Sequence, residues 1–264
     1  MRSSHRLVGL ATIAVLVFLY VPIGIIFLYA FNGDRTQTWP IDNWTTHWWG
    51  DAFANESIRE ALLLSVEVAL AATALALLLG SLASFAVHRF RFFGRNTVSF
   101  LLVLPIALPG IVTGMALNAT FHTADIPFGF LTIVVGHATF CVVVVYNNVI
   151  ARLRRSSPNI EEASMDLGAD TWQTFRYVTL PVIRTALLAG GLLAFALSFD
   201  EVIVTTFTAG TQETLPIWIL ANLRLPNQRP LVNVVAVTLI LLSAIPVYLS
   251  HRFSSDAGGP GRRI

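Results

Sequence analysis

Three carboxylate side chains, those of Glu67, Asp200 and Glu201, lie inside stretches of sequence that are otherwise apolar. An ionised carboxylate within a bilayer is costly, so such residues usually face the interior of a helical bundle or a water-filled path. A carboxylate there could attract a cation, and an aromatic ring such as Phe199 or Tyr20 could add a cation–π contact. These acids are therefore candidates for the path of a cationic solute.

The three carboxylates are expected at a similar depth in the outer half of the membrane. Neighbouring residues of a helix point about 100° apart, so a continuous helix cannot aim Asp200 and Glu201 at one path. We expect Asp200 to face the path and Glu201 to have a structural role. For Glu67 a second interpretation stays open, a buried carboxyl that is hydrogen-bonded or protonated.

Enzyme chemistry is not predicted. The chain of 264 residues contains no lysine, so it has neither a P-loop lysine nor a Schiff-base lysine. No Ser–His–Asp pattern and no metal-ligand spacing is present, so we predict no catalytic residue, no metal and no cofactor on this chain. The lone Cys141 cannot form an internal disulfide. For His137, within an apolar run, a hydrogen bond between helices is favoured over a proton relay.

The elements that carry these residues are predicted to be membrane spans. The chain is 55% hydrophobic and 12% charged, against about 25% charged in a soluble domain. Several apolar runs reach the roughly 20 residues that cross a bilayer. We predict an all-α protein with six transmembrane helices, at about 7–31, 61–87, 98–120, 128–150, 185–208 and 231–250. The first is interpreted as an uncleaved span, and Pro105, Pro109, Gly110 and Gly114 should loosen the third.

The arginines predict the orientation of the spans. With the N-terminus inside, the cytoplasmic segments carry thirteen arginines and the outer segments four, Arg35, Arg59, Arg224 and Arg229. This bias agrees with the positive-inside rule and places both termini in the cytoplasm. Net charge is only +2, without a basic patch for nucleic acid. The outer loop 32–60 holds four tryptophans, which predict a short helix at the membrane surface or, alternatively, a docking surface for an extracytoplasmic partner.

The polar segment, residues 161–181, is predicted to be cytoplasmic and to form two short helices. Glu161 and Glu162 suit a first helical turn, and Gly168 suits the left-handed residue that ends a helix. Asp170 is a good N-cap, with a glutamine three residues later. Pro181 is expected to close the unit before the next span. From these residues alone the segment is either a docking unit for a partner or simply a structured loop.

The segment resembles the EAA loop of ABC-importer permeases, in Glu162-Ala163-Ser164, Gly168 and Val178–Pro181; Ser164 and Val178 depart conservatively from that pattern. Over nearly the whole chain the sequence is most similar to the second permease subunit of spermidine/putrescine importers. The stretches that carry this resemblance are Tyr20–Ile23, Phe31-Asn32, Trp44 and Trp48, Asn55–Ser65, Phe90–Gly94 and Ser198–Phe207.

The resemblance implies a type I ABC-importer permease fold in the inner membrane of a bacterium. It implies a permease domain over residues 1–253, a coupling loop at 152–184 and, with the Gly-rich composition, a disordered tail at 254–264. The residues that would couple to the ATPase are Glu161, Glu162, Ala163, Asp166, Gly168, Asp170, Leu180 and Pro181.

The implied partners are a second, homologous permease in a heterodimer, two copies of an ATPase that bind ATP and Mg, and an extracytoplasmic solute-binding protein. The implied solute is a polyamine. Alternatives are another small solute, such as an aminophosphonate or thiamine, an ion-coupled secondary transporter that uses Glu67 and Asp200, and a membrane scaffold without transport.

Overall fold

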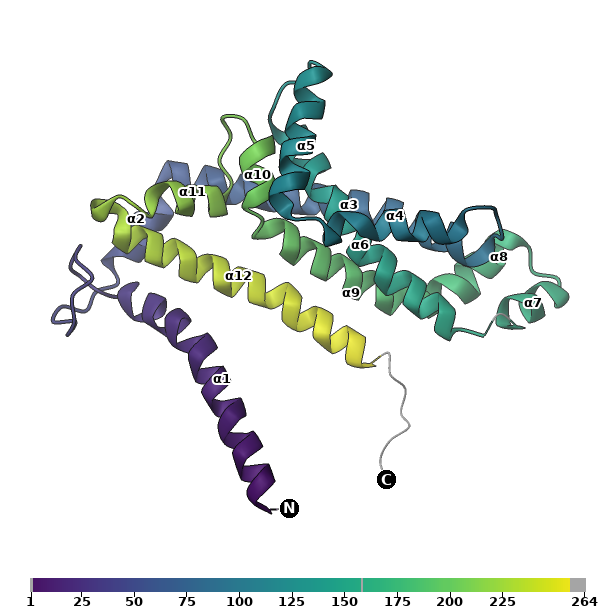
Figure 1. The fold of residues 1–264 in the computed structure, drawn as a ribbon, viewed down its shortest axis with the longest axis horizontal. Coiled ribbons are helices and arrows are strands. Elements are labelled where there is room, and N and C mark those ends of the chain that lie inside the picture. The colour runs from purple at the N-terminus through teal and green to yellow at the C-terminus, as the bar shows by residue number, and fades with distance from the viewer. Residues whose placement is uncertain (1, 158, 257–264) are drawn as a thin grey trace. The chain divides into compact units, whose positions relative to one another are not determined.

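The computed structural model describes the backbone of residues 2–157 and 159–256, and the side chains of residues 7–157 and 159–253. Over this part of the chain the regular elements are helices joined by loops, together with one isolated β-bridge between Asn32 and Trp44 (Figure 1). The α-helices are α1 (Arg2–Tyr29), α2 (His47–Ala54), α3 (Glu56–Arg89), α4 (Arg95–Ala107), α5 (Gly110–Thr123), α6 (Phe130–Arg155), α7 (Asn159–Asp166), α8 (Thr171–Thr174), α9 (Leu180–Phe199), α10 (Ile203–Thr208), α11 (Leu215–Asn222) and α12 (Arg229–Asp256).

Five described helical stretches are long and apolar enough to cross a membrane, and α4 with α5 makes a sixth if the two count as one bent span. The all-α prediction and the six apolar stretches are therefore confirmed. The third span is bent by 104° rather than merely loosened. The break lies at Leu108, which is extended, and Pro109, because a residue before proline is forced out of the helical region. The predicted tail 254–264 lies outside the described residues except for 254–256, whose backbone continues α12.

The chain divides into two compact units. The first comprises Met1–Ala61 with Leu215–Leu241 and contains α1, α2 and α11. Within it the Trp48 indole donates to the backbone oxygen of Asn32 at 3.0 Å, and the Trp218 indole donates to Ser57 Oγ at 3.1 Å. A short helix in the tryptophan-rich loop is thus confirmed as α2, and its tryptophan Trp48 is buried in this unit rather than exposed.

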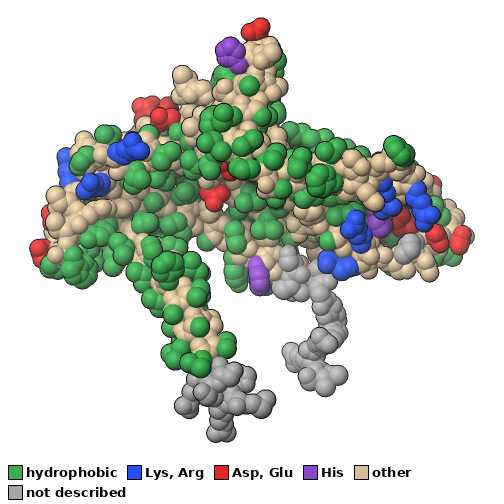
Figure 2. All heavy atoms as spheres, in the orientation of Figure 1, with side chains coloured by type: hydrophobic (Ala, Val, Ile, Leu, Met, Phe, Trp, Pro, Cys, Tyr) green, Lys and Arg blue, Asp and Glu red, His purple; other side chains and the backbone are tan. Residues whose placement is uncertain are grey.

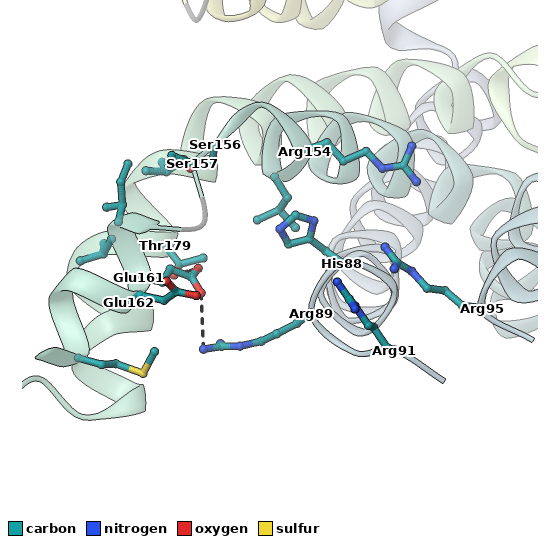
Figure 3. Close-up of a pocket in the computed structure, with 15 residues that line it drawn as sticks. His88, Arg89, Arg91, Arg95, Arg154, Ser156, Ser157, Glu161, Glu162 and Thr179 are labelled. Carbon is teal, nitrogen blue, oxygen red and sulfur yellow. Dashed lines mark hydrogen bonds and ion pairs between the residues drawn. The ribbon is translucent and has the colours of Figure 1, made fainter. Parts of the chain in front are cut away.

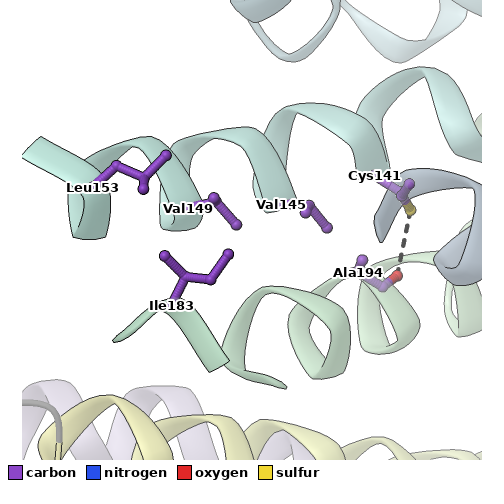
Figure 4. Close-up of a cluster of buried hydrophobic side chains, with 7 residues drawn as sticks. Cys141, Val145, Val149, Leu153, Ile183 and Ala194 are labelled. Atoms are coloured by element: carbon purple, nitrogen blue, oxygen red, sulfur yellow. Dashed lines mark hydrogen bonds between the residues drawn. The ribbon is translucent and has the colours of Figure 1, made fainter. Parts of the chain in front are cut away.

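The second unit comprises Leu62–Thr214 with Leu242–Ile264, and α6 packed along α9 forms its centre. Val145, Val149 and Leu153 of α6 are buried against Ile183 and Ala194 of α9 (Figure 4). The Cys141 thiol lies in the same cluster and donates to the backbone oxygen of Ala194 at 3.3 Å. Small residues let these helices approach closely, as is usual in membranes.

The contact between α3 and α6 depends on Gly80. A Cβ built there would lie 2.9 Å from the backbone oxygen of Val142 and 2.9 Å from Cβ of Val145. Neither atom is the free end of a flexible side chain, so a larger residue would force the two helices apart. Elsewhere the surface is strongly apolar, and hydrophobic side chains cover much of the face drawn in Figure 2.

The prediction of one continuous helix over 185–208 is wrong at its start and in its interior, although α10 does end at Thr208. The helical stretch begins at Thr171 and passes through a π-helical turn, Phe175–Thr179, into α9. It ends at Phe199, residues 200–202 are not helical, and α10 starts at Ile203. The break therefore falls on the two acids that the sequence analysis singled out.

Candidate functional sites

The polar segment forms two short helices, as predicted. Helix α7 ends in a Schellman motif: the backbone N–H of Ala169 donates to the oxygen of Ser164 at 3.1 Å, and that of Gly168 donates to the oxygen of Met165 at 2.9 Å. Gly168 has φ +90°, where a side chain is disfavoured, and a Cβ there would meet nothing within 4 Å. Glycine is therefore needed at this position for its backbone conformation and not for space.

The second helix begins with the predicted capping box. The Gln173 N–H donates to Asp170 Oδ1 at 2.8 Å, and the Asp170 N–H donates to Gln173 Oε1 at 2.9 Å. This reciprocal pair gives Asp170 a local structural role. Its side chain is nevertheless exposed.

Pro181 does not close the unit, contrary to the prediction. It lies in the first turn of α9, directly after the π-helical turn. In a regular α-helix a proline ring clashes with the carbonyl four residues earlier and removes one hydrogen bond. Here the Leu180 N–H reaches back five residues, to the oxygen of Phe175, so the wider turn precedes the proline without ending the helix.

Glu161 fastens the polar segment to the rest of the second unit. Its Oε1 accepts a hydrogen bond from Thr179 Oγ1 at 2.6 Å, and its Oε2 lies 3.5 Å from Nη2 of Arg89 at the end of α3 (Figure 3). Ser164 and Thr174 add a hydroxyl contact of 3.2 Å between the two short helices. Arg89 and Thr179 are contributions that the sequence analysis missed.

The remaining residues predicted to couple to a partner lie at the surface of the segment. The exposed ones are Glu162, Ala163, Asp166, Gly168, Asp170, Leu180 and Pro181. Large apolar side chains stand among them, with Leu167 at 89% and Trp172 at 64% exposed. The segment therefore combines an internal framework of hydrogen bonds with an apolar and acidic outer surface.

The two broken spans meet inside the second unit. Helix α10 packs against α5 and α6, and a Cβ built on Gly110 would lie 3.6 Å from Cγ2 of Ile203. These are the first helical residues after the two breaks. Asn118 Nδ2 donates to the backbone oxygen of Phe207 at 2.7 Å and thereby satisfies a carbonyl near the end of α10. Broken helices of this kind at membrane depth are tolerated where protein or a water-filled cavity surrounds them.

Glu201 caps the short helix α10. Its Oε1 accepts a hydrogen bond from the Val204 N–H at 2.9 Å. Asp200 ends α9, and its side chain is exposed. Because both residues lie in the break, the argument from a continuous helix does not apply to them. The geometry nevertheless distinguishes the carboxylate of Glu201, which caps α10, from the exposed side chain of Asp200.

Glu67 lies on the outside of the second unit. The exposed positions along that part of α3 form one stripe, with Leu63, Leu70 and Leu78 beside Glu67. Among the described residues, no hydrogen bond or ion pair involves its carboxylate, so within this chain it is not the buried, hydrogen-bonded carboxyl of the second interpretation. A charge on an apolar helix face calls for water or a further protein surface rather than lipid.

His137 links the two sides of the α9–α10 break. Its Nδ1 lies 2.7 Å from Ser198 Oγ, and its Nε2 lies 2.8 Å from Thr205 Oγ1. The Thr205 hydroxyl donates to the backbone oxygen of Glu201 at 2.8 Å, so its oxygen must accept from the histidine. Nε2 therefore carries a proton, and in neutral imidazole Nδ1 accepts from Ser198. The predicted hydrogen bond between helices is confirmed, but no local pattern around His137 indicated that both ring nitrogens would be used.

Residues 76–256 match the family model described as "binding-protein-dependent transport system inner membrane component". The chain belongs to this family. It is thus a permease, a membrane component of a transport system and not an enzyme, as predicted.

Individual relatives agree with this assignment. The permease is 36% identical to the putrescine transport system permease protein PotI of Escherichia coli K12, over 91% of this chain and 86% of the relative. It is 34% identical to the spermidine/putrescine transport system permease protein PotC of Haemophilus influenzae, over 90% and 92% of the two chains. The predicted resemblance to polyamine permeases is confirmed.

Solved structures share the fold. A bacterial ABC transporter that imports alginate matches with a TM-score of 0.67 at 14% identity, over 97% of this chain and 96% of the other. The MetNI methionine ABC transporter matches with a TM-score of 0.58 at 18% identity, over 78% and 100%. The permease therefore has the type I ABC-importer fold.

Proposed function

We propose that this permease forms half of the translocation path of an ATP-driven polyamine importer, with putrescine and spermidine as solutes. The observation that carries the proposal is the similarity to two polyamine permeases over about nine-tenths of the chain. A protonated polyamine is a flexible cation, and exposed carboxylates at membrane depth are the complementary chemistry.

The position of the acids supports a path at the surface of this chain. Asp200 is exposed at the break between α9 and α10, and Glu67 is exposed on an otherwise apolar stripe of α3. Neither position suits contact with lipid. A second permease subunit, different but homologous, would enclose these carboxylates in a shared path. Asp200 is the residue proposed to contact the solute first, and Glu201 holds the break in shape.

The polar segment is the proposed contact with the energy source. Its outer residues Glu162, Ala163, Asp166 and Leu180 would bind a cytosolic ATPase, one copy to each permease. ATP and Mg would bind to that ATPase, which supplies the hydrolysis. Glu161 connects the segment to the end of α3, so movement of the segment would pass into a membrane span. An extracytoplasmic binding protein would deliver the solute to the opposite face.

The proposed location is the inner membrane of a bacterium, with both termini in the cytoplasm. The excess of arginine in the inner segments supports this orientation. The substitution Leu167→Cys, in a Cys141→Ser background, would test this orientation, because Leu167 is exposed. The introduced thiol should react with an impermeant maleimide only after the cells are opened, and reaction in intact cells would reverse the orientation.

Purification of the tagged permease from its own host, in mild detergent, tests the assembly. We expect a P-loop ATPase and a second six-span permease to co-purify. The binding protein of the same system is then titrated with putrescine, spermidine, thiamine and an aminophosphonate. Binding of only one of the latter two would replace the polyamine with that solute. Ion-driven uptake by this chain alone in liposomes would instead favour a secondary transporter.

A further inference from the structure

A basic cleft lies between the C-terminal end of α3 and the polar segment. One wall carries His88, Arg91, Arg95 and Arg154, and the other carries Glu161 and Glu162 (Figure 3). The cleft has a volume of about 640 Å³ and is open to the surface. All of these residues belong to the second unit.

The cleft has more positive than negative charge. Four arginines line it, Arg89 included, against two glutamates, which gives a formal charge of +2 with His88 neutral. Arg89 pairs with Glu161. For Arg91, Arg95 and Arg154, no ion pair exists among the side chains that the structure describes. Three guanidinium groups from three elements thus converge without a carboxylate partner, the arrangement with which arginine binds phosphate.

The loop between α3 and α4, which carries Arg91 and leads into Arg95, also presents phenylalanines. Residues 88–95 mix basic and aromatic side chains, and Phe90, Phe92 and Phe93 are exposed, Phe93 completely. A second hollow, lined by residues 91–97, adjoins the cleft and shares Arg91 and Arg95 with it. The loop joins the end of one span to the start of the next, so it lies where the bilayer meets water. Exposed aromatic rings beside arginines at that depth favour a lipid surface over a soluble protein.

We propose that the basic cleft binds the phosphate of an anionic phospholipid, with the phenylalanines of residues 90–93 inserted among the acyl chains. Basic pockets at the ends of membrane spans are recognised lipid sites. The bound headgroup would lie beside the Arg89–Glu161 ion pair, so lipid composition would affect the attachment of the polar segment. This site is separate from the proposed solute path, and the proposal does not depend on which solute is carried.

Native mass spectrometry of the purified complex, titrated with phosphatidylglycerol, tests the proposal. Each of Arg91→Gln, Arg95→Gln and Arg154→Gln should weaken binding about fivefold, and the triple variant about a hundredfold. Arg155→Gln is the matched control, because Arg155 is exposed and adjacent to Arg154 but does not line the cleft. It should change the affinity less than twofold. Phe93→Ser should also weaken binding, because its ring would no longer enter the bilayer.

Each of the following results would overturn the proposal. If phosphatidylcholine bound as tightly as phosphatidylglycerol, the site would not require a lipid with a net negative charge. Full competition by millimolar inorganic phosphate would make the ligand a free anion rather than a lipid. Unchanged lipid binding by the triple variant would place the lipid elsewhere, and simultaneous loss of the co-purified ATPase would assign the cleft to that protein. If the triple variant does not fold, unchanged binding by all three single variants contradicts the proposal equally.

Discussion

The carboxylate of Glu161 accepts a hydrogen bond from Thr179 at 2.6 Å, across the turn that separates the two short helices of the polar segment. The same carboxylate reaches Arg89 at the end of α3. One residue therefore joins the segment to itself and to a membrane span. If a cytosolic ATPase docks on the segment, as proposed, this connection would transmit movement of the ATPase to the membrane spans.

Removal of the Glu161 carboxylate should loosen the segment and weaken its partner binding. We expect Glu161→Ala to weaken ATPase binding about tenfold, because a hydrogen bond to a charged group contributes about 1.5–3 kcal/mol and this one is only partly buried. The measurement is the dissociation constant for the ATPase. Thr179→Val is the second arm of a double-mutant cycle. Strictly additive effects of the two substitutions would show that the bond does not matter for docking.

Substitution of Gly168 tests the backbone alone. Gly168→Ala should destabilise the segment by about 1 kcal/mol, because φ +90° is costly for any residue with a Cβ. Gly168→Pro should be far worse, because proline fixes φ near −65°, and should uncouple or dissociate the ATPase. Hydrogen exchange of α7 and ATPase co-purification measure the two effects. Gly24→Ala is the control, because Gly24 lies within helix α1 and a Cβ built there would meet no atom within 4 Å. Transport by an intact Gly168→Pro complex would contradict this account of the segment.

His137 is predicted to be a structural link and not a proton carrier. His137→Leu would leave Ser198 and Thr205 without their partner, at a cost of about 1–3 kcal/mol in stability. His137→Gln keeps a donor and an acceptor and should recover part of the stability and most of the transport. Thermal unfolding and uptake are measured together. A His137→Gln protein that is stable but inactive would instead indicate a relay.

The acids of the proposed path should differ in their sensitivity. Asp200→Asn should lower polyamine uptake at least tenfold without loss of assembly, since it removes only a charge. Glu67→Gln should have a similar but smaller effect. Glu201→Gln keeps the oxygen that caps α10 and should be tolerated, whereas Glu201→Ala should destabilise by about 1 kcal/mol. Glu60→Gln, an exposed residue near the start of α3, is the control. Equal uptake by wild type and Asp200→Asn would remove Asp200 from the path.

Composition and periodicity were sufficient for the number of apolar stretches, for the two short helices and for a weak point in the third span, although not for its sharp bend. Pro109 and Gly110 are local signals of a helix break, because they change the backbone angles that the chain can adopt at that point. The break at residues 200–202 has no proline or glycine, and β-branched residues follow it directly, so the stretch resembles any apolar helix. It is held by side chains, Glu201 on Val204 and His137 on Ser198 and Thr205. His137 lies more than 60 residues away from both of its partners, which no local pattern reveals.

The ion pair of Arg89 with Glu161 could not be predicted from the sequence either, because the two residues are far apart in the chain. Its partners are separated by two spans, and arginine at the end of a span is already explained by the positive-inside rule. The prediction for Pro181 was wrong for a different reason. The proline was noted, but a π-helical turn just before it lets the helix continue where a stop was expected. The candidate sites could thus be located from sequence, whereas the contacts that shape them required the fold.

The most direct test of the central claim is uptake of labelled putrescine by proteoliposomes that contain the purified complex, with ATP inside and the solute-binding protein outside. The account predicts uptake that requires ATP and the binding protein and that falls at least tenfold in the Asp200→Asn complex. Uptake that proceeds without ATP, or by this chain without its partners, would contradict it.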